Sequence, residues 1–184
     1  MRVTKEKAAE NRERILAEAS RLFREKGFDG VGVDAIMEAA GLTHGGFYRH
    51  FRSKEDLATE ATARALARSG EKLAGCDRLG DYVDAYLSRE HLVDRGDGCV
   101  MAALSCDIAR QGAGVRGGLT AYLRGRLELL AGWFGGSRAA RRRQAIATLS
   151  GVVGAMVLAR AVDDPALADE ILAAGREVFG RAKA

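Results

Sequence analysis

Residues 33–51 constrain the fold more than any other part of the chain, because they place two short helical segments on either side of a tight turn. Gly41 stands where a helix C-terminus commonly needs a residue with positive φ. Phe47 and Phe51 are four residues apart, so one helical face carries both rings toward a core. Polar and basic residues occupy much of the remaining surface of the second segment. This arrangement predicts a helix-turn-helix, whose second helix enters the major groove of duplex DNA.

The second helical segment carries the candidate DNA contacts. Thr43 is a good N-cap, because its hydroxyl can accept a hydrogen bond from an exposed amide two or three residues on. Gly45 and Gly46 each cost about 1 kcal/mol in a helix relative to alanine. Without side chains, however, they let the backbone approach DNA closely. The residues expected to contact DNA are Thr43, His44, Gly45, Gly46, Tyr48, Arg49, His50 and Lys54.

The first third of the chain resembles the TetR/AcrR family of bacterial transcriptional regulators. The resemblance covers about residues 10–57 and rests on short pieces that follow one another at the family's spacing. These pieces are Ile15–Phe23, Lys26–Phe28, Asp34–Ile36, Ala40–Thr43, Gly45–Tyr48, His50–Phe51 and Lys54–Leu57.

The resemblance implies a homodimeric repressor that a small-molecule inducer releases from double-stranded operator DNA. Base readout would fall to His44 and Arg49, with the backbone of the glycines close to the DNA. Phosphate contacts, which set the register on DNA, would come from Thr43, Tyr48, His50 and Lys54.

Some positions depart from the family's usual pattern. Gly32 stands where many members have a Ser or Thr cap, and Asp34 lies where many carry Arg or Lys. A carboxylate cannot pair with a phosphate, so DNA contacts from the first segment of the motif are in doubt. Gly46 replaces a frequent Thr or Ser. The expected readout therefore shifts onto His44, Arg49 and the exposed backbone between them.

The composition favours an all-helical fold. The 184 residues include a single proline, Pro165, and are 47% hydrophobic, which is typical of a globular chain. We expect a three-helix DNA-binding domain over residues 1–57, called the head below. A helical ligand-binding and dimerisation domain, called the body, is expected over residues 58–184. Together they should hold about nine helices. Two of them lie within residues 33–51. The others lie near residues 5–26, 53–73, 79–93, 98–111, 116–134, 137–162 and 166–181.

Two segments near the C-terminus have faces suited to a dimer. Small residues line one face of 137–162, and apolar residues recur at helical spacing in 166–181. Packing against a second copy would form a four-helix interface, and a two-fold dimer matches a two-fold operator. Packing within one chain is the alternative. The residues expected at the interface are Gly151, Gly154, Ala155, Leu158, Ile171 and Val178.

Large apolar residues of the body are candidates for an inducer pocket, which is typically apolar with a few polar groups. Taken singly, each of them is equally suited to an ordinary core. The candidates are Tyr86, Met101, Leu104, Cys106, Tyr122, Trp133 and Met156.

Cys99 and Cys106 are seven residues apart and would share one face of the expected helix over residues 98–111. Buried structural cysteine is the commoner case. Arg110, one turn from Cys106, would favour a reactive thiolate. A cysteine-based sensor of oxidants or electrophiles on the same fold is therefore an alternative function.

Other features exclude several classes of protein. An odd number of cysteines without CxxC spacing argues against a disulfide framework, and His44, His50 and His91 show no metal-ligand spacing. We find no nucleophile–base pair and no phosphate-cradling loop, so we expect neither an enzyme nor a cofactor. The charged N-terminus lacks a signal peptide, and the apolar stretch 145–159 is too short for a membrane span, which favours the cytoplasm. The net charge of +4 allows DNA binding without demonstrating it, so a helical binding module without DNA function stays open.

Overall fold

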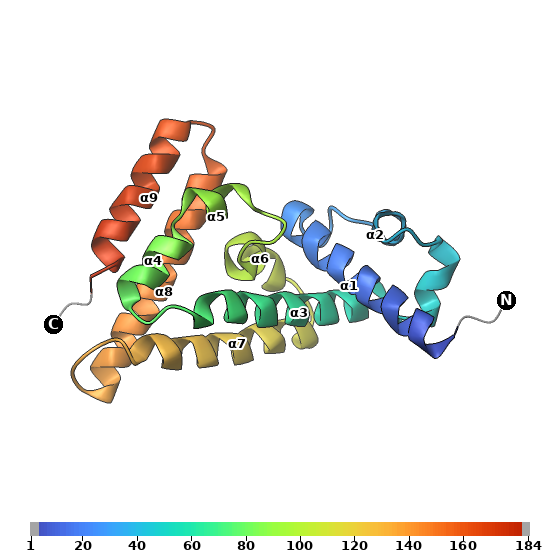
Figure 1. The fold of residues 1–184 in the computed structure, drawn as a ribbon, viewed down its shortest axis with the longest axis horizontal. Coiled ribbons are helices and arrows are strands. Elements are labelled where there is room, and N and C mark those ends of the chain that lie inside the picture. The colour runs from blue at the N-terminus through green and yellow to red at the C-terminus, as the bar shows by residue number, and fades with distance from the viewer. Residues whose placement is uncertain (1–3, 182–184) are drawn as a thin grey trace.

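The computed structural model describes residues 4–181, apart from the side chains of residues 71–74, and every regular element in that range is helical. The all-α prediction is therefore confirmed. The molecule is elongated, with the N-terminal helices at one end and the C-terminal pair at the other (Figure 1). The expected domains also included residues 1–3 and 182–184, which lie outside the described range. The elements are α1 (Lys5–Lys26), α2 (Val33–Ala39), the 3-10 helix η1 (His44–Arg49), α3 (Lys54–Ala74), α4 (Leu79–Tyr86), α5 (Arg89–Val93), α6 (Val100–Ile108), α7 (Ala113–Ala131), α8 (Arg138–Ala161) and α9 (Pro165–Phe179).

Helix α1 has a local signal at each end. The Thr4 hydroxyl accepts a hydrogen bond from the Lys7 amide, 3.2 Å away. At the other end Gly27 adopts φ +76° and stops the helix. Ile15 and Phe23 lie on the buried face of α1. The helix therefore gives the head one side of its core.

Helix α3 joins the head to the body. It packs on α1 in the head and on α7 in the body, so the predicted boundary at residue 57 falls inside a continuous helix. One buried cluster runs from the head into α6 and the start of α7, and includes Leu104 and Val115. A second cluster fills the rest of the body between α4, α6, α7, α8 and α9. A movement in the body thus has a direct mechanical route to the head.

The prediction of one helix over residues 79–93 is wrong. The chain breaks after Tyr86, and Ser88 caps a new helix by accepting a hydrogen bond from the His91 amide at 3.1 Å. Arg176 of α9 donates to the Leu87 carbonyl at 2.6 Å. This distant arginine satisfies a carbonyl that a continuous helix would have used internally.

The helix predicted near residues 116–134 begins three residues earlier, because α7 starts at Ala113. Gly112 is the N-cap, and Gly117 and Gly118 are helical with open space where a Cβ would lie. Packing of α7 on α3 and α8 outweighs the low helix propensity of these glycines.

The apolar stretch 145–159, predicted to be too short for a membrane span, lies within the longer helix α8. Helix α8 has 24 residues, and by length and composition it is long and apolar enough to cross a membrane. The shortness of the apolar stretch 145–159 therefore does not decide the question, because the helix that contains it is longer. A single helix of this kind is weak evidence, since packed helices of soluble proteins pass the same test. In this structure α8 packs against α6, α7 and α9.

Candidate DNA-binding interface

The core of the head supports the helix-turn-helix from below. Ile36 and Met37 of α2 are buried, together with Phe47 of η1. The Phe47 and Phe51 ring centroids lie 5.8 Å apart, and both side chains are buried as predicted. The neighbouring residues on η1 are consequently turned toward the surface.

The turn between α2 and η1 depends on Gly41. This glycine has φ +65°, a conformation that other residues rarely adopt. Arg14 of α1 donates a hydrogen bond to the Ala40 carbonyl, and a Cβ at Gly41 would lie 2.7 Å from its Nη2. Gly41 is therefore needed both for the backbone turn and for the approach of the arginine.

The sequence predicted a short helix as the second helix of the motif, and the structure shows that it is a 3-10 helix. Its amides bond three residues back, from Gly46 to the Thr43 carbonyl at 3.0 Å and from His50 to the Phe47 carbonyl at 2.9 Å. Two successive glycines explain the weak preference for the α form. Thr43 occupies the N-cap position, but its hydroxyl makes no capping bond. The predicted cap is wrong, and this leaves the hydroxyl available for a phosphate.

The predicted DNA-contacting residues come together along η1 and the start of α3. Tyr48 is 69% exposed, and a Cβ at Gly45 would meet nothing within 4 Å. A Cβ at Gly46 would lie 3.6 Å from Met37 Cε. Three members of the set are half-buried, namely Gly46, His50 and Lys54, while Thr43, His44, Gly45, Tyr48 and Arg49 are exposed.

A close polar contact between His44 Nδ1 and the Asp34 carboxylate ties η1 to α2. Sequence reasoning treated Asp34 only as an obstacle to phosphate contact and missed this partner. The signal was an acidic residue in the first segment and a histidine at the start of the second. With Nδ1 turned toward Asp34, the other ring nitrogen of His44, Nε2, takes no part in this contact.

Basic groups surround His50 at the end of η1. Burial lowers the pKa of His50 below its ordinary value, and the positive charges of Arg12 and Arg49 lower it further. His50 is therefore neutral at pH 7 and offers one N–H donor without a full charge. Lys54 lies at the first position of α3, where the Ser53 hydroxyl caps the helix by accepting from the Asp56 amide at 3.1 Å.

The structure divides the predicted pocket residues between core and surface. Tyr86, Met101, Leu104 and Met156 are buried, Tyr122 and Trp133 are half-buried, and Cys106 is exposed. A cavity of about 200 Å³ lies between α3, α4, α5 and the start of α6, and of this predicted set only Tyr86 lines it. The described lining is Ser69, Ala85, Tyr86, Ser88, Glu90, His91, Asp94, Asp97, Gly98 and Cys99.

The two cysteines named as candidate sensors do not share one exposed face. Cys99 is buried and is the N-cap of α6, whereas Cys106 is exposed. Arg110 forms an ion pair with Asp107. The guanidinium expected to assist Cys106 thus has a carboxylate partner.

The predicted dimer residues fall into two groups. A Cβ at Gly151 would lie 2.0 Å from Phe179 Cζ, and Ala155 faces Gly175, so these two positions pack α8 on α9 within the chain. Ile171 is half-buried against the body core. Leu158 and Val178 are exposed, and Gly154 has open space around it.

Comparison with known proteins places the head in a family. Residues 15–61 match the model of bacterial regulatory proteins, tetR family. The HTH-type transcriptional regulator AcrR of Shigella flexneri is 40% identical over 70 residues, which are 38% of this chain and 33% of AcrR. The HTH-type transcriptional repressor NemR of Escherichia coli K12 is 27% identical over 130 residues, 66% of this chain and 65% of NemR. The chain spans from about a third to just under two thirds of the length of these relatives.

Solved structures extend the likeness of the fold to the body. The reduced form of E. coli NemR has a TM-score of 0.77 and 23% identity, over 95% of this chain and 97% of that one. A TetR transcriptional regulator from Chloroflexus aurantiacus has a TM-score of 0.78 and 25% identity, over 96% and 98%. A helix-turn-helix on α1, α2 and η1, joined by α3 to a helical body, defines the class of helix-turn-helix regulators. Within that class, residues 15–61 of the chain match the tetR family.

Proposed function

We propose that the chain is a DNA-binding transcriptional regulator, acting as a homodimeric repressor that a small molecule releases from its operator. The observation that carries this proposal is the arrangement on η1. Exposed Tyr48, Arg49 and His44 stand over buried Phe47 and Phe51, which presents polar and basic groups on a rigid support. The names of AcrR, a regulator, and NemR, a repressor, agree with it.

Release of DNA is proposed to be a shift between two arrangements of the head. A ligand changes such an equilibrium only by binding the two arrangements with different affinity. The body cavity touches α3 through Ser69, and α3 is the helix that begins at Lys54 in the head. Ligand in the cavity would therefore favour a spacing of the two heads that no longer matches successive major grooves.

Lys54→Ala tests the DNA-binding assignment. Loss of one phosphate contact should weaken binding about tenfold on every duplex and reduce the salt slope by about one. The measurement is fluorescence anisotropy across a KCl series, on DNA from upstream of the gene and on a scrambled duplex. Lys26→Ala, at the exposed end of α1, is the matched control and should bind like the parent.

Two results would contradict the assignment. A loss confined to one operator sequence would make Lys54 a base contact. No binding to any duplex at low salt, with a folded dimer confirmed, would favour a helical binding module without DNA function.

A cysteine sensor is the second candidate, favoured by the exposure of Cys106 on α6. Cys106→Ser should then abolish the release of DNA by hydrogen peroxide or a quinone, while buried Cys99→Ser responds like the parent. The readout is the same anisotropy assay before and after oxidation. Unchanged release in the Cys99→Ser/Cys106→Ser double variant would reject this function.

A further inference from the structure

We propose that the body cavity binds a small organic cation, and that the cation competes for Asp97 with two arginines that hold the head to the body. The consequence for DNA rests on the proposed function, whereas binding of the cation does not.

The cavity wall is acidic. Its described lining includes the acidic residues Glu90, Asp94 and Asp97 and contains no lysine or arginine. Tyr86 adds an aromatic ring, and this side chain is only 2% exposed, with a hydroxyl that has no hydrogen-bond partner within the described structure. An aromatic ring beside carboxylates favours a cationic ligand, through charge pairing and cation–π attraction.

Within the described residues, the basic groups beside the cavity are His91 and Arg160. The Cys99 amide donates to His91 Nε2 at 3.0 Å, so Nδ1 carries the proton and donates to the Tyr86 carbonyl at 2.6 Å. These two bonds define a neutral imidazole, because an amide N–H cannot accept. Arg160 donates to the carbonyls of His91 and Asp94 and is absent from the cavity lining.

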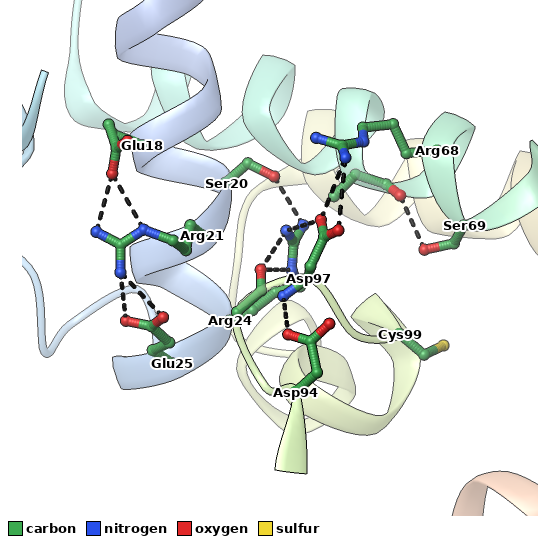
Figure 2. Close-up of polar contacts among 12 residues, drawn as sticks. Glu18, Ser20, Arg21, Arg24, Glu25, Arg68, Ser69, Asp94, Asp97 and Cys99 are labelled. Carbon is green, nitrogen blue, oxygen red and sulfur yellow. Dashed lines mark hydrogen bonds and ion pairs between the residues drawn. The ribbon is translucent and has the colours of Figure 1, made fainter. Parts of the chain in front are cut away.

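The segment that carries Asp94 and Asp97 has a second face. Both residues also line an open hollow between the end of α1 and the middle of α3. Asp97 Oδ1 lies 3.6 Å from Arg24 Nη2 of α1 and 3.5 Å from Arg68 Nη2 of α3. Figure 2 shows the Asp97 carboxylate between these two guanidinium groups, which come from different helices. One acidic residue thus lines the cavity and contacts both the head and the connecting helix.

Arg24 makes this shared carboxylate important for the head. Its side chain is buried, with 8% of the residue exposed. It donates through Nε to the Gly96 carbonyl at 2.7 Å and through Nη1 to the Ser20 hydroxyl at 2.7 Å. Burial lowers the pKa of Arg24, and the charge of Asp97 opposes that change. Asp97 therefore stabilises a buried cation at the junction, and a ligand that takes a share of its charge weakens the junction.

Thermodynamic linkage fixes the sign of the effect that cation binding has on DNA affinity. If the Arg24–Asp97–Arg68 arrangement favours the DNA-binding state, a cation that competes for Asp97 must lower DNA affinity, and DNA must lower cation affinity by the same factor. Removal of Arg68 leaves the cavity wall intact and removes one competitor. Cation binding should then become tighter while DNA binding becomes weaker.

Binding is tested first, in the absence of DNA. Titration calorimetry on the full chain uses benzamidinium, benzylammonium and tetramethylammonium, with benzamide and benzoate as near-isosteric neutral and anionic probes. We expect benzamidinium to bind about tenfold or more tightly than benzamide, and benzoate not to bind. Asp94→Asn keeps an oxygen for the bond from the Asp97 amide but removes the charge, so it should weaken benzamidinium binding about tenfold. Glu170→Gln, exposed on α9, is the control and should bind like the parent.

The coupling is tested second, with anisotropy on operator DNA. Saturating benzamidinium should weaken DNA binding by the parent several-fold, and Arg68→Met should bind benzamidinium about threefold more tightly. If none of the three cations binds, or if benzamide binds as well as benzamidinium, the cation site is overturned. If cations bind in the calorimeter but leave DNA affinity unchanged, the coupling through Asp97 is overturned. If the parent binds no DNA at all, the failure lies in the proposed function, and the calorimetry still decides the cation site.

Discussion

The Phe47→Ala variant is expected to lose about 3–5 kcal/mol of stability and, with it, the ability to bind DNA. Phe47 is 1% exposed, and its ring packs beside Phe51 and edge-on to Tyr48 at 5.2 Å. Truncation would leave a void beneath η1, a short helix whose glycines give it little stability of its own. For a chain of this size the loss corresponds to a fall in Tm of roughly 6–20 °C, measurable by circular dichroism.

Tyr48→Ala is the matched control, one residue along the same helix. Because Tyr48 is exposed, its truncation should leave Tm nearly unchanged while weakening DNA binding about tenfold. The pair separates support of the helix from contact with DNA. Equal destabilisation by both variants, or full DNA affinity in Tyr48→Ala, would show that η1 does not present the face proposed for it.

The sequence predicted the head well, because local residues determine its geometry. Gly41 adopts positive φ at the end of the first helix of the motif, where its position predicted it. Phe47 and Phe51 are buried as their four-residue spacing requires. The pairing of His44 with Asp34 depends on the distance between two helices, which residue spacing alone does not give.

The body was predicted less well, because its details depend on contacts between distant residues. At the break between α4 and α5, the Leu87 carbonyl accepts a hydrogen bond from Arg176 of α9, which is far along the chain. The large apolar residues chosen for a pocket mostly became core, as Met101 and Met156 show. The cavity is instead lined by polar residues of α5 and the following loop, such as Glu90 and Asp94. A local signal did exist, since Ser88 and Glu90 form a good helix start.

The far end of the molecule carries an apolar surface suited to a second copy of the chain. Helices α8 and α9 lie at the opposite end from the head (Figure 1). They expose large apolar side chains that a monomer would leave in water, which is a signature of an interaction site when such side chains are contiguous. The exposed residues on these two helices are Ile146, Val157, Leu158, Leu167 and Val178.

A Leu158→Glu/Val178→Glu double variant is expected to be a folded monomer that binds operator DNA about 10²–10⁴-fold more weakly. Both side chains are more than half exposed, at 58% and 57%, so the carboxylates cost little in one chain. In a dimer they would be buried without partners. The weak binding follows because two joined heads engage two half-sites as one unit. Light scattering gives the mass, and anisotropy gives the DNA affinity.

Leu129→Glu is the control for the double variant, since Leu129 is an exposed leucine on α7 and is not one of the residues expected at the interface. It should keep both the mass and the DNA affinity of the parent. If the parent protein is already monomeric at micromolar concentration, the proposal of a homodimer is rejected. If the double variant stays dimeric, the dimer interface does not lie on this surface of α8 and α9. A monomeric double variant that keeps full operator affinity would mean that one head is enough for DNA binding. This result would reject the proposed requirement for matched spacing of two heads.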